Sequence, residues 1–183
     1  MSEKEPIVIY DYSEDWPILF VDLARRLRES LGPVALRIDH IGSSSIPGLA
    51  AKPIVDIQIS VASLEPVDPF RVPLEALGFA WRRDNPDRNK RYFREKPGTR
   101  RTHIHVVRAG SWREQFALLF RDYLRGHPND RKEYEAVKRE LAKEYRNDRV
   151  RYTDGKSDIL WEMMVRADRW ARETGWEAGP SDA

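Results

Sequence analysis

Apolar residues recur with the spacing of a helix near the start of the chain. A leucine stands at every fourth position of one stretch, which places these side chains on a single helical face. The members of this stripe are Leu19, Leu23, Leu27 and Leu31. Pro17 suits the first turn of such a helix, and Gly32 favours its end. The pattern therefore predicts a helix over residues 16–31.

Alternation of apolar and polar residues predicts strands in the middle of the chain. The clearest segment is 53–61, where Asp56 and Gln58 face away from the valines and isoleucines. Residues 101–108 have the same period, with two histidines on one face. Three further segments are predicted to be strands, namely 34–41, 79–83 and 90–95.

Helical spacing returns after residue 110. Ser111 and Glu114 have the spacing of a capping box, which predicts a helix that ends before Pro128. Further helices are predicted at 70–77, 131–145 and 156–173. This order of elements predicts an α/β (α+β) fold with an N-terminal helix, a mixed sheet of about four or five strands, and C-terminal helices.

The length of 183 residues fits a single domain. We expect it to span residues 1–176, with the sheet core at about 10–108 and the C-terminal helical part at about 111–174. Residues 177–183 contain glycine, proline, serine and aspartate, so we expect a flexible tail there.

Composition excludes several classes of function. Lys and Arg number 32 and Asp and Glu number 30, so the net charge is 32 − 30 = +2, and nucleic-acid binding is not expected. The absence of cysteine excludes disulfides, thiol nucleophiles and Cys-based zinc sites. The acidic N-terminus does not resemble a signal peptide, and no apolar run is long enough to span a bilayer. We therefore expect a cytoplasmic protein without membrane association.

The strongest chemical signal is a Gly/Ser/Pro-rich turn followed by an acidic residue on a strand. Gly42, Ser43 and Ser44 form the turn, whose backbone N–H groups suit a phosphate. Asp56 follows on the next strand, and Mg²⁺ binds through few carboxylates together with substrate phosphates. Lys52 lies between the two, where it would neutralise phosphate charge. A glycine turn beside an edge-facing aspartate would give the same pattern.

At these residues the chain resembles the GrpB family. The resemblance is carried by HIGSSSIPGLAAKPIVDI at 40–57, RTHIHVV at 101–107, FRDYLR at 120–125 with His127 and Pro128, and by Tyr152 and Lys156. It implies a polymerase β-like nucleotidyltransferase fold. In that superfamily a Gly-Ser turn holds the nucleotide's phosphates, and carboxylates on the adjoining and later strands bind metal. By this resemblance, Gly42 and Ser43 match the phosphate turn and Asp56 matches the first carboxylate.

The sequence departs from active nucleotidyltransferases at two places. Gln58 stands where a second acidic residue is expected, and an amide lacks the negative charge that two-metal chemistry uses. His103 and His105 stand where the later carboxylate is expected. Imidazoles there would act as metal ligands or as acid–base groups.

The leading hypothesis is a protein that binds a nucleoside triphosphate with Mg²⁺, or Mn²⁺, and transfers a nucleotidyl group to an unidentified acceptor. The expected catalytic residues are Asp56, His103 and His105, with Asp56 also the metal ligand. The expected phosphate or substrate contacts are Gly42, Ser43, Ser44, Lys52, Gln58 and Lys156.

Two alternatives remain open on the sequence. One is a non-catalytic module that binds a nucleotide or phospho-metabolite through an incomplete metal site. The other is a transition-metal hydrolase that uses both histidines and Asp56, since such sets suit these metals.

Overall fold

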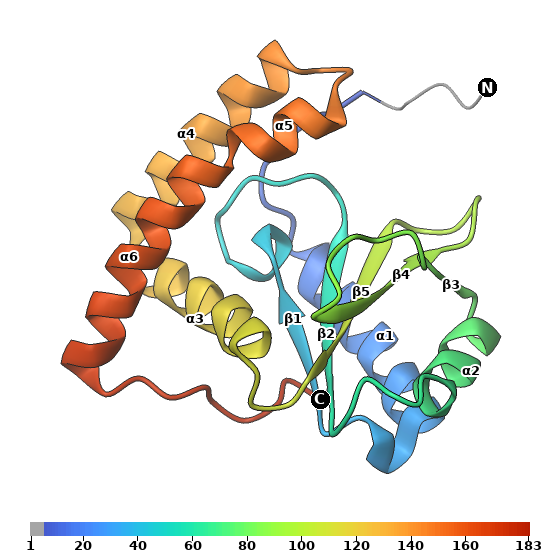
Figure 1. The fold of residues 1–183 in the computed structure, drawn as a ribbon. Helices are drawn as coiled ribbons and strands as arrows, with labels where there is room; N and C mark the ends of the chain where they lie inside the picture. The colour runs from blue at the N-terminus through green and yellow to red at the C-terminus, as the bar shows by residue number, and fades with distance from the viewer. Residues whose placement is uncertain (1–5) are drawn as a thin grey trace.

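The computed structural model describes residues 6–183, in which a five-stranded mixed sheet carries helices on both faces (Figure 1). The strands are β1 (Arg37–Ile41), β2 (Val55–Val61), β3 (Phe79–Trp81), β4 (Lys90–Glu95) and β5 (Thr102–Arg108). The helices are α1 (Asp15–Leu31), α2 (Asp68–Ala76), α3 (Trp112–Gly126), α4 (Pro128–Glu144), α5 (Arg149–Gly155) and α6 (Ser157–Thr174). None of these helices combines the length and the apolar character needed to cross a bilayer.

The strand order is β1-β2-β5-β4-β3. Strand β2 pairs antiparallel with β1 and parallel with β5, and the remaining pairs are antiparallel. The parallel pair includes the central strand, β5, and brings together segments almost fifty residues apart in the chain. The predicted mixed sheet with an N-terminal helix and C-terminal helices is confirmed.

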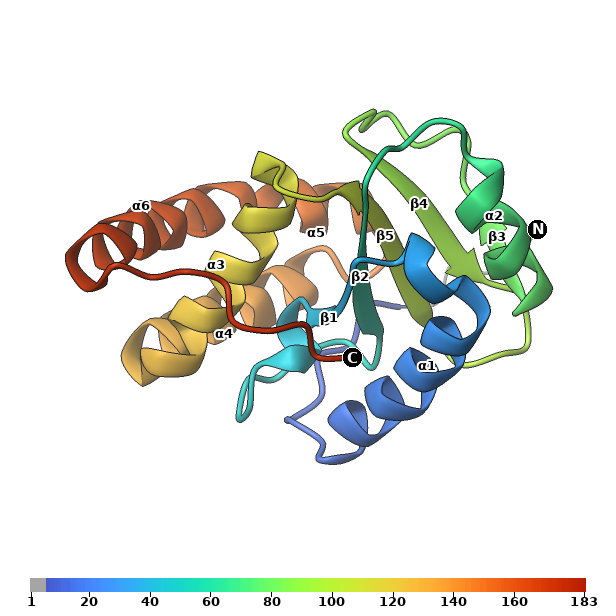
Figure 2. The same cartoon turned by 90° about the horizontal axis from the view of Figure 1, so that it is seen from below.

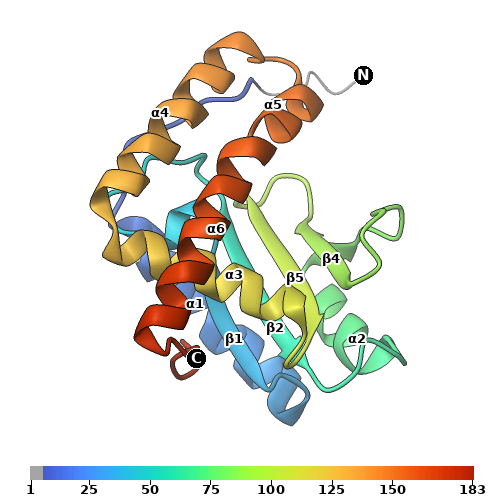
Figure 3. The same cartoon turned by 60° about the vertical axis from the view of Figure 1, so that its left-hand side comes forward.

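The main hydrophobic core lies between the sheet and helices α1 and α2, which cover one face (Figure 2). The predicted alternation decides which side chains enter this core. Ile57 and Ile59 of β2 and Ile104 of β5 are fully buried in it, whereas the polar residues between them face the other side. That other face receives α3, and the C-terminal helices lie beyond its edge (Figure 3).

A second core joins α3, α4 and α6 to the turn after β1. Ile46 and Leu49, which follow the short 3₁₀ helix Ser43–Ser45, are fully buried against Leu124, Tyr134 and Met163 of these helices. At about 1.5–3 kcal/mol for each large apolar side chain removed from water, this packing fixes the turn firmly to the helical layer. The Gly-Ser turn is therefore held between the sheet and the C-terminal helices.

Helix α5 is the one helix of the described chain that the sequence pattern did not predict. It has seven residues, and Asp148 caps it by accepting a hydrogen bond from the N–H of Arg151 at 3.0 Å. Its sequence is too short and too polar for an apolar stripe. Strand β1 is also shorter than predicted, because a 3₁₀ turn at Gly32–Val34 precedes it.

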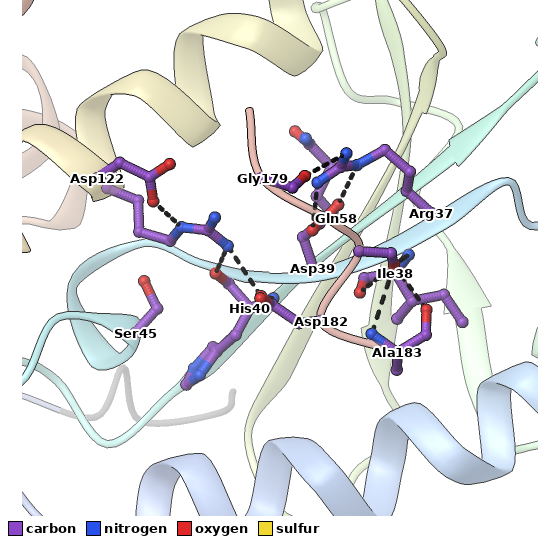
Figure 4. Close-up of polar contacts among 12 residues, drawn as sticks. Arg37, Ile38, Asp39, His40, Ser45, Gln58, Asp122, Gly179, Asp182 and Ala183 are labelled. Carbon is purple, nitrogen blue, oxygen red and sulfur yellow. Dashed lines mark hydrogen bonds and ion pairs between the residues drawn. The ribbon is translucent and has the colours of Figure 1, made fainter. Parts of the chain in front are cut away.

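The C-terminal residues predicted to form a flexible tail lie along the outer edge of β1 (Figure 4). The N–H of Ala183 donates to the carbonyl of Ile38 at 3.2 Å, and the N–H of His40 donates to Asp182 Oδ2 at 2.9 Å. Asp182 also accepts from Arg121, whose side chain is only 4% exposed, at 2.8 Å. The tail thus covers an open sheet edge and neutralises a buried guanidinium.

We predict that Asp182→Ala lowers the free energy of unfolding by about 1–3 kcal/mol, because Arg121 stays buried with fewer acceptors. The loss is limited because Arg121 keeps its bonds to Asp122 and to the carbonyl of His40. Urea unfolding followed by circular dichroism measures it. Asp84→Ala, at an exposed carboxylate, is the matched control, and equal effects of both variants would contradict the structural role of the tail.

Candidate functional site

A cavity of about 340 Å³ lies where the end of the sheet meets helices α4 and α5. Five parts of the chain contribute to its wall: the turn after β1, the starts of β2 and β5, and the facing sides of α4 and α5. Its polar lining residues include Gly42, Ser43, Ser44, Lys52, Asp56, His103, His105, Lys138 and Lys156. Eight of these nine were predicted from the sequence as site residues.

The carboxylate of Asp56 contacts both His103 and His105. Its Oδ1 is 3.0 Å from His103 Nδ1 and 3.5 Å from His105 Nε2. The parallel register explains this grouping, because Asp56 pairs directly with His103, and His105 is two residues further along the same face. The sequence prediction that these three side chains share one face is thus confirmed.

Hydrogen bonds control the charge of this group. Burial opposes the ionisation of Asp56, but hydrogen bonds from His103 and His105 outweigh it and hold the pKa of Asp56 well below its ordinary value. Burial lowers the pKa of His105, and the bond to Asp56 offsets this only in part. Near neutral pH the cluster therefore holds a carboxylate beside a neutral His105 imidazole.

Gly42 allows the turn to approach this carboxylate. Its φ of 70° and ψ of −172° lie in a region that essentially only glycine occupies. A β-carbon at this position would lie 2.8 Å from Asp56 Oδ2, well inside contact distance. Both the backbone conformation and the lack of space for a β-carbon therefore require glycine after β1. With glycine there, the Ser43–Ser45 turn lies directly beside Asp56.

His40 contacts the turn through Ser44 and does not line the cavity. Its Nε2 is 3.1 Å from Ser44 Oγ, and its ring stacks on Phe20 with centroids 4.8 Å apart. Burial lowers the pKa of His40 to about 4, so the ring is neutral under ordinary conditions. Ser44 is thereby engaged in the protein interior, and His40 has a structural role.

Three lysines provide the positive charge of the cavity. Lys138 of α4 is 2% exposed, and its Nζ donates to Ser43 Oγ at 3.1 Å and to the carbonyl of Ala50 at 2.5 Å. Lys52 and Lys156 both lie over the ring of Tyr152, at 5.3 and 4.6 Å from its centroid. Among the residues lining the cavity in the described chain, Asp56 is the only carboxylate.

The lysines are poorly solvated and repel one another. Burial, followed by the charge of Lys156, lowers the pKa of Lys138 to about 7. The same two causes lower the pKa of Lys52 to about 8. Burial also lowers the pKa of Lys156. An anion in the cavity would relieve this repulsion, so the arrangement suits a polyanionic ligand such as a chain of phosphates.

Gln58 is the one predicted site residue that does not line the cavity. Its side chain is 1% exposed and donates through Nε2 to the carbonyl of Glu114 at 3.3 Å. Gln58 shares a strand face with Asp56. It is two residues further along β2, however, where α3 covers the sheet. Its role in the structure is to join β2 to α3.

Lys138 is the site residue that the sequence reasoning missed. It stands four residues after Tyr134 and four before Ala142, both of which are buried. A lysine in line with the apolar stripe of a helix is the signal that could have identified it, because such a position is seldom occupied by a charge without a partner. Tyr134 of the same helix also lines the cavity.

Comparisons with known proteins identify relatives of the chain. The profile described as GrpB protein matches residues 6–166. UPF0157 protein YqkA of Bacillus subtilis is 39% identical over 170 residues, which cover 92% of this chain and 49% of YqkA, so the chain spans about half of that relative.

Solved structures are similar to this chain as well. The conserved protein GrpB from Enterococcus faecalis matches with a TM-score of 0.78 and 30% identity, over 89% of this chain and 99% of that one. The Cid1 poly(U) polymerase with Mg and 3′-dATP bound matches with a TM-score of 0.51 and 14% identity, over 75% of this chain and 43% of Cid1. At that identity the likeness concerns the fold alone, which is that of the polymerase β-like nucleotidyltransferases.

We predict that Gly42→Ala destabilises the protein by about 1–3 kcal/mol from backbone strain, with a further loss from the contact with Asp56. Gly110→Ala is the matched control, because Gly110 has a similar φ of 69° but no atom within 4 Å of an added β-carbon. Chemical denaturation of both variants separates strain from crowding. Equal losses would show that the approach of the turn to Asp56 is unimportant.

Proposed function

Since this chain belongs to the GrpB protein family and has the fold of the nucleotidyltransferases, we propose that it binds a nucleoside triphosphate with a divalent cation in the cavity beside Asp56. The proposed reaction is transfer of the nucleotidyl group to an acceptor, by in-line displacement at the α-phosphate. The observation that carries the proposal is the grouping of three partly desolvated lysines in the cavity that the Gly-Ser turn lines.

The charges of the cavity fit the parts of such a ligand. Lys52, Lys138 and Lys156 would bind the β- and γ-phosphates, whose roughly two to three negative charges would offset the mutual repulsion of the ammonium groups. Lys138 already donates to Ser43 Oγ, so it would fix the turn and the phosphates together.

Asp56 is the group that would hold the cation. A single carboxylate is sufficient where the substrate's own phosphates complete the coordination. The cation would supply neutralisation of charge on the displaced pyrophosphate. His103 and His105, beside the carboxylate, would act as acid–base groups or as further ligands of the cation.

A second candidate is a binding module without catalysis. The position of Gln58, which contacts α3 and supplies no second carboxylate to the cavity, favours it. This module would bind phosphates through the lysines alone. Its binding would then be independent of divalent metal and of Asp56, whereas binding by the enzyme would depend on both.

We predict that nucleoside triphosphates with Mg²⁺ or Mn²⁺ raise the melting temperature of the wild type. A ligand at 100 times its Kd stabilises a fold by about 2.7 kcal/mol. Lys138→Met should reduce the shift under all conditions, because it deletes a buried ammonium group of the phosphate site. Asp56→Asn should remove the metal-dependent part of the shift.

Lys143→Met is the matched control, since Lys143 is exposed on the same helix and does not line this cavity. Each shift is measured against the variant's own melting temperature in the absence of ligand. A metal-independent shift that survives Asp56→Asn would favour the binding module. The absence of a shift with every nucleotide would overturn the proposed function.

Nucleotide binding should also take up protons. Lys138 and Lys52 have pKa values of about 7 and 8, so at pH 8 Lys138 is mostly neutral and Lys52 about half neutral. Bound phosphates favour the charged lysines and raise both pKa values, so we expect affinity to fall as pH rises from 7 to 9.

Isothermal titration calorimetry at pH 8, in two buffers of different ionisation enthalpy, measures this uptake. The terminal phosphate, with a second pKa near 6, is already ionised there and contributes little. Lys138→Met should take up fewer protons than Lys143→Met. Zero uptake in the wild type would mean that these lysines do not contact the ligand.

A further inference from the structure

We propose that Asp56, His103 and His105 form a site for a first-row divalent transition metal, which they bind in preference to Mg²⁺. The inference refines the cation of the proposed function, but it concerns binding of the metal by the protein alone.

The donor atoms have the spacing of ligands around one ion. Asp56 Oδ1 is 3.0 Å from His103 Nδ1 and 3.5 Å from His105 Nε2. Each of the three residues offers a ligand atom within 4.8 Å of those of the other two. Ligands at about 2.1 Å from a metal are separated by about 3.0 Å at octahedral angles and about 3.4 Å at tetrahedral angles. The two short separations therefore match both common geometries with little rearrangement.

The donors are also held in place before any ion binds. Asp56 and His103 are direct partners in the β2–β5 ladder, and His105 is on the same strand. Gly42 lies against the other carboxylate oxygen, so Asp56 has little freedom to turn. Tyr92 of β4 flanks both imidazoles, with ring centroids 5.5 and 5.2 Å away. A site built on paired strands loses little conformational entropy when it binds.

The chemistry of the donors disfavours Mg²⁺. Magnesium prefers oxygen ligands and is bound by protein sites mainly through their negative charge. This set has one carboxylate and two imidazoles, and imidazole nitrogen suits Zn²⁺, Fe²⁺, Co²⁺ and Ni²⁺. The residues that match the carboxylate positions of nucleotidyltransferases thus fit a different class of metal.

The surroundings of the site strengthen this preference. Lys52, Lys138 and Lys156 line the same cavity, and the described lining holds no further carboxylate. Mg²⁺ alone would have to overcome that positive charge with a single negative partner. A transition metal gains from its bonds to nitrogen, which do not depend on the charge of the ligand. One to three coordination positions would remain open for phosphate oxygens or water.

Metal binding to the purified full chain, without nucleotide, tests the proposal. We expect one equivalent of Co²⁺ with a visible absorption band, one equivalent of Mn²⁺ by electron paramagnetic resonance, and displacement of both by Zn²⁺. Mg²⁺ should need at least about a 100-fold higher concentration to compete, following the ligand preferences of these ions. Competition by Mg²⁺ at concentrations similar to those of Mn²⁺ would overturn the proposal.

Three variants locate the site. His103→Ala and His105→Ala should each weaken Co²⁺ binding at least about tenfold, the lower range found for altered metal sites. His127→Asn, which removes a histidine outside the cavity, should leave binding unchanged. Equal binding by all three would place the metal elsewhere and refute the assignment.

His105→Asp provides a positive test that does not depend on loss of binding. It adds an oxygen donor and a negative charge, so it should reduce the preference for Co²⁺ over Mg²⁺. An unchanged preference would count against His105 as a ligand. Because no nucleotide is present, these results can fail while the nucleotide-dependent melting shifts succeed, and the reverse also holds.

Discussion

The parallel pairing of β2 with β5 is the interaction on which the candidate site depends. Its register places Asp56 directly opposite His103, and the period of two in a strand then brings His105 to the same face. A slip of one residue would turn the aspartate or the histidines into the hydrophobic core, which Ile57 and Ile104 occupy. Burial of the isoleucines on one face therefore fixes the positions of Asp56, His103 and His105 on the other. The same two strands thus serve both folding and the candidate site.

The second constraint is that two layers meet at the Gly-Ser turn. The sheet supplies the carboxylate and the imidazoles, whereas helices α4 and α5 supply Tyr134, Lys138 and Tyr152. Ile46 and Leu49 fasten the turn to the helical core, and the glycine at position 42 brings it against Asp56. A shift of the helical layer would therefore move Lys138 and Lys156 relative to the carboxylate. The tail along β1 opposes such a shift, because Asp182 joins β1 to Arg121 of α3.

Much of this arrangement could be predicted from the sequence, because strand alternation and glycine turns are local signals. They were enough to place Asp56, His103 and His105 on one face and the turn beside them. What could not be predicted depends on tertiary contacts. Lys138 is ninety-five residues from its partner Ser43, α5 has no apolar period, and the tail is ordered by side-chain bonds to a strand far away in the chain. Gln58 lies on the same strand face as Asp56, as the alternation predicts, yet α3 covers it. No local sequence pattern reveals that contact.

The buried lysines bear most directly on function. Lys138 is almost fully buried, is partly neutral near pH 7 and is paired with no carboxylate among the contacts described for its ammonium group. Such a residue reduces the stability of the protein, since an apolar side chain of similar volume would pack there without a desolvation cost. Residues that break the rules of a stable core are expected where binding needs them. Asp56 differs, because hydrogen bonds from two imidazoles hold its pKa low and support its charge. The cavity thus contains three lysines and one carboxylate, and a ligand that carries both phosphates and a metal ion would match both signs of charge.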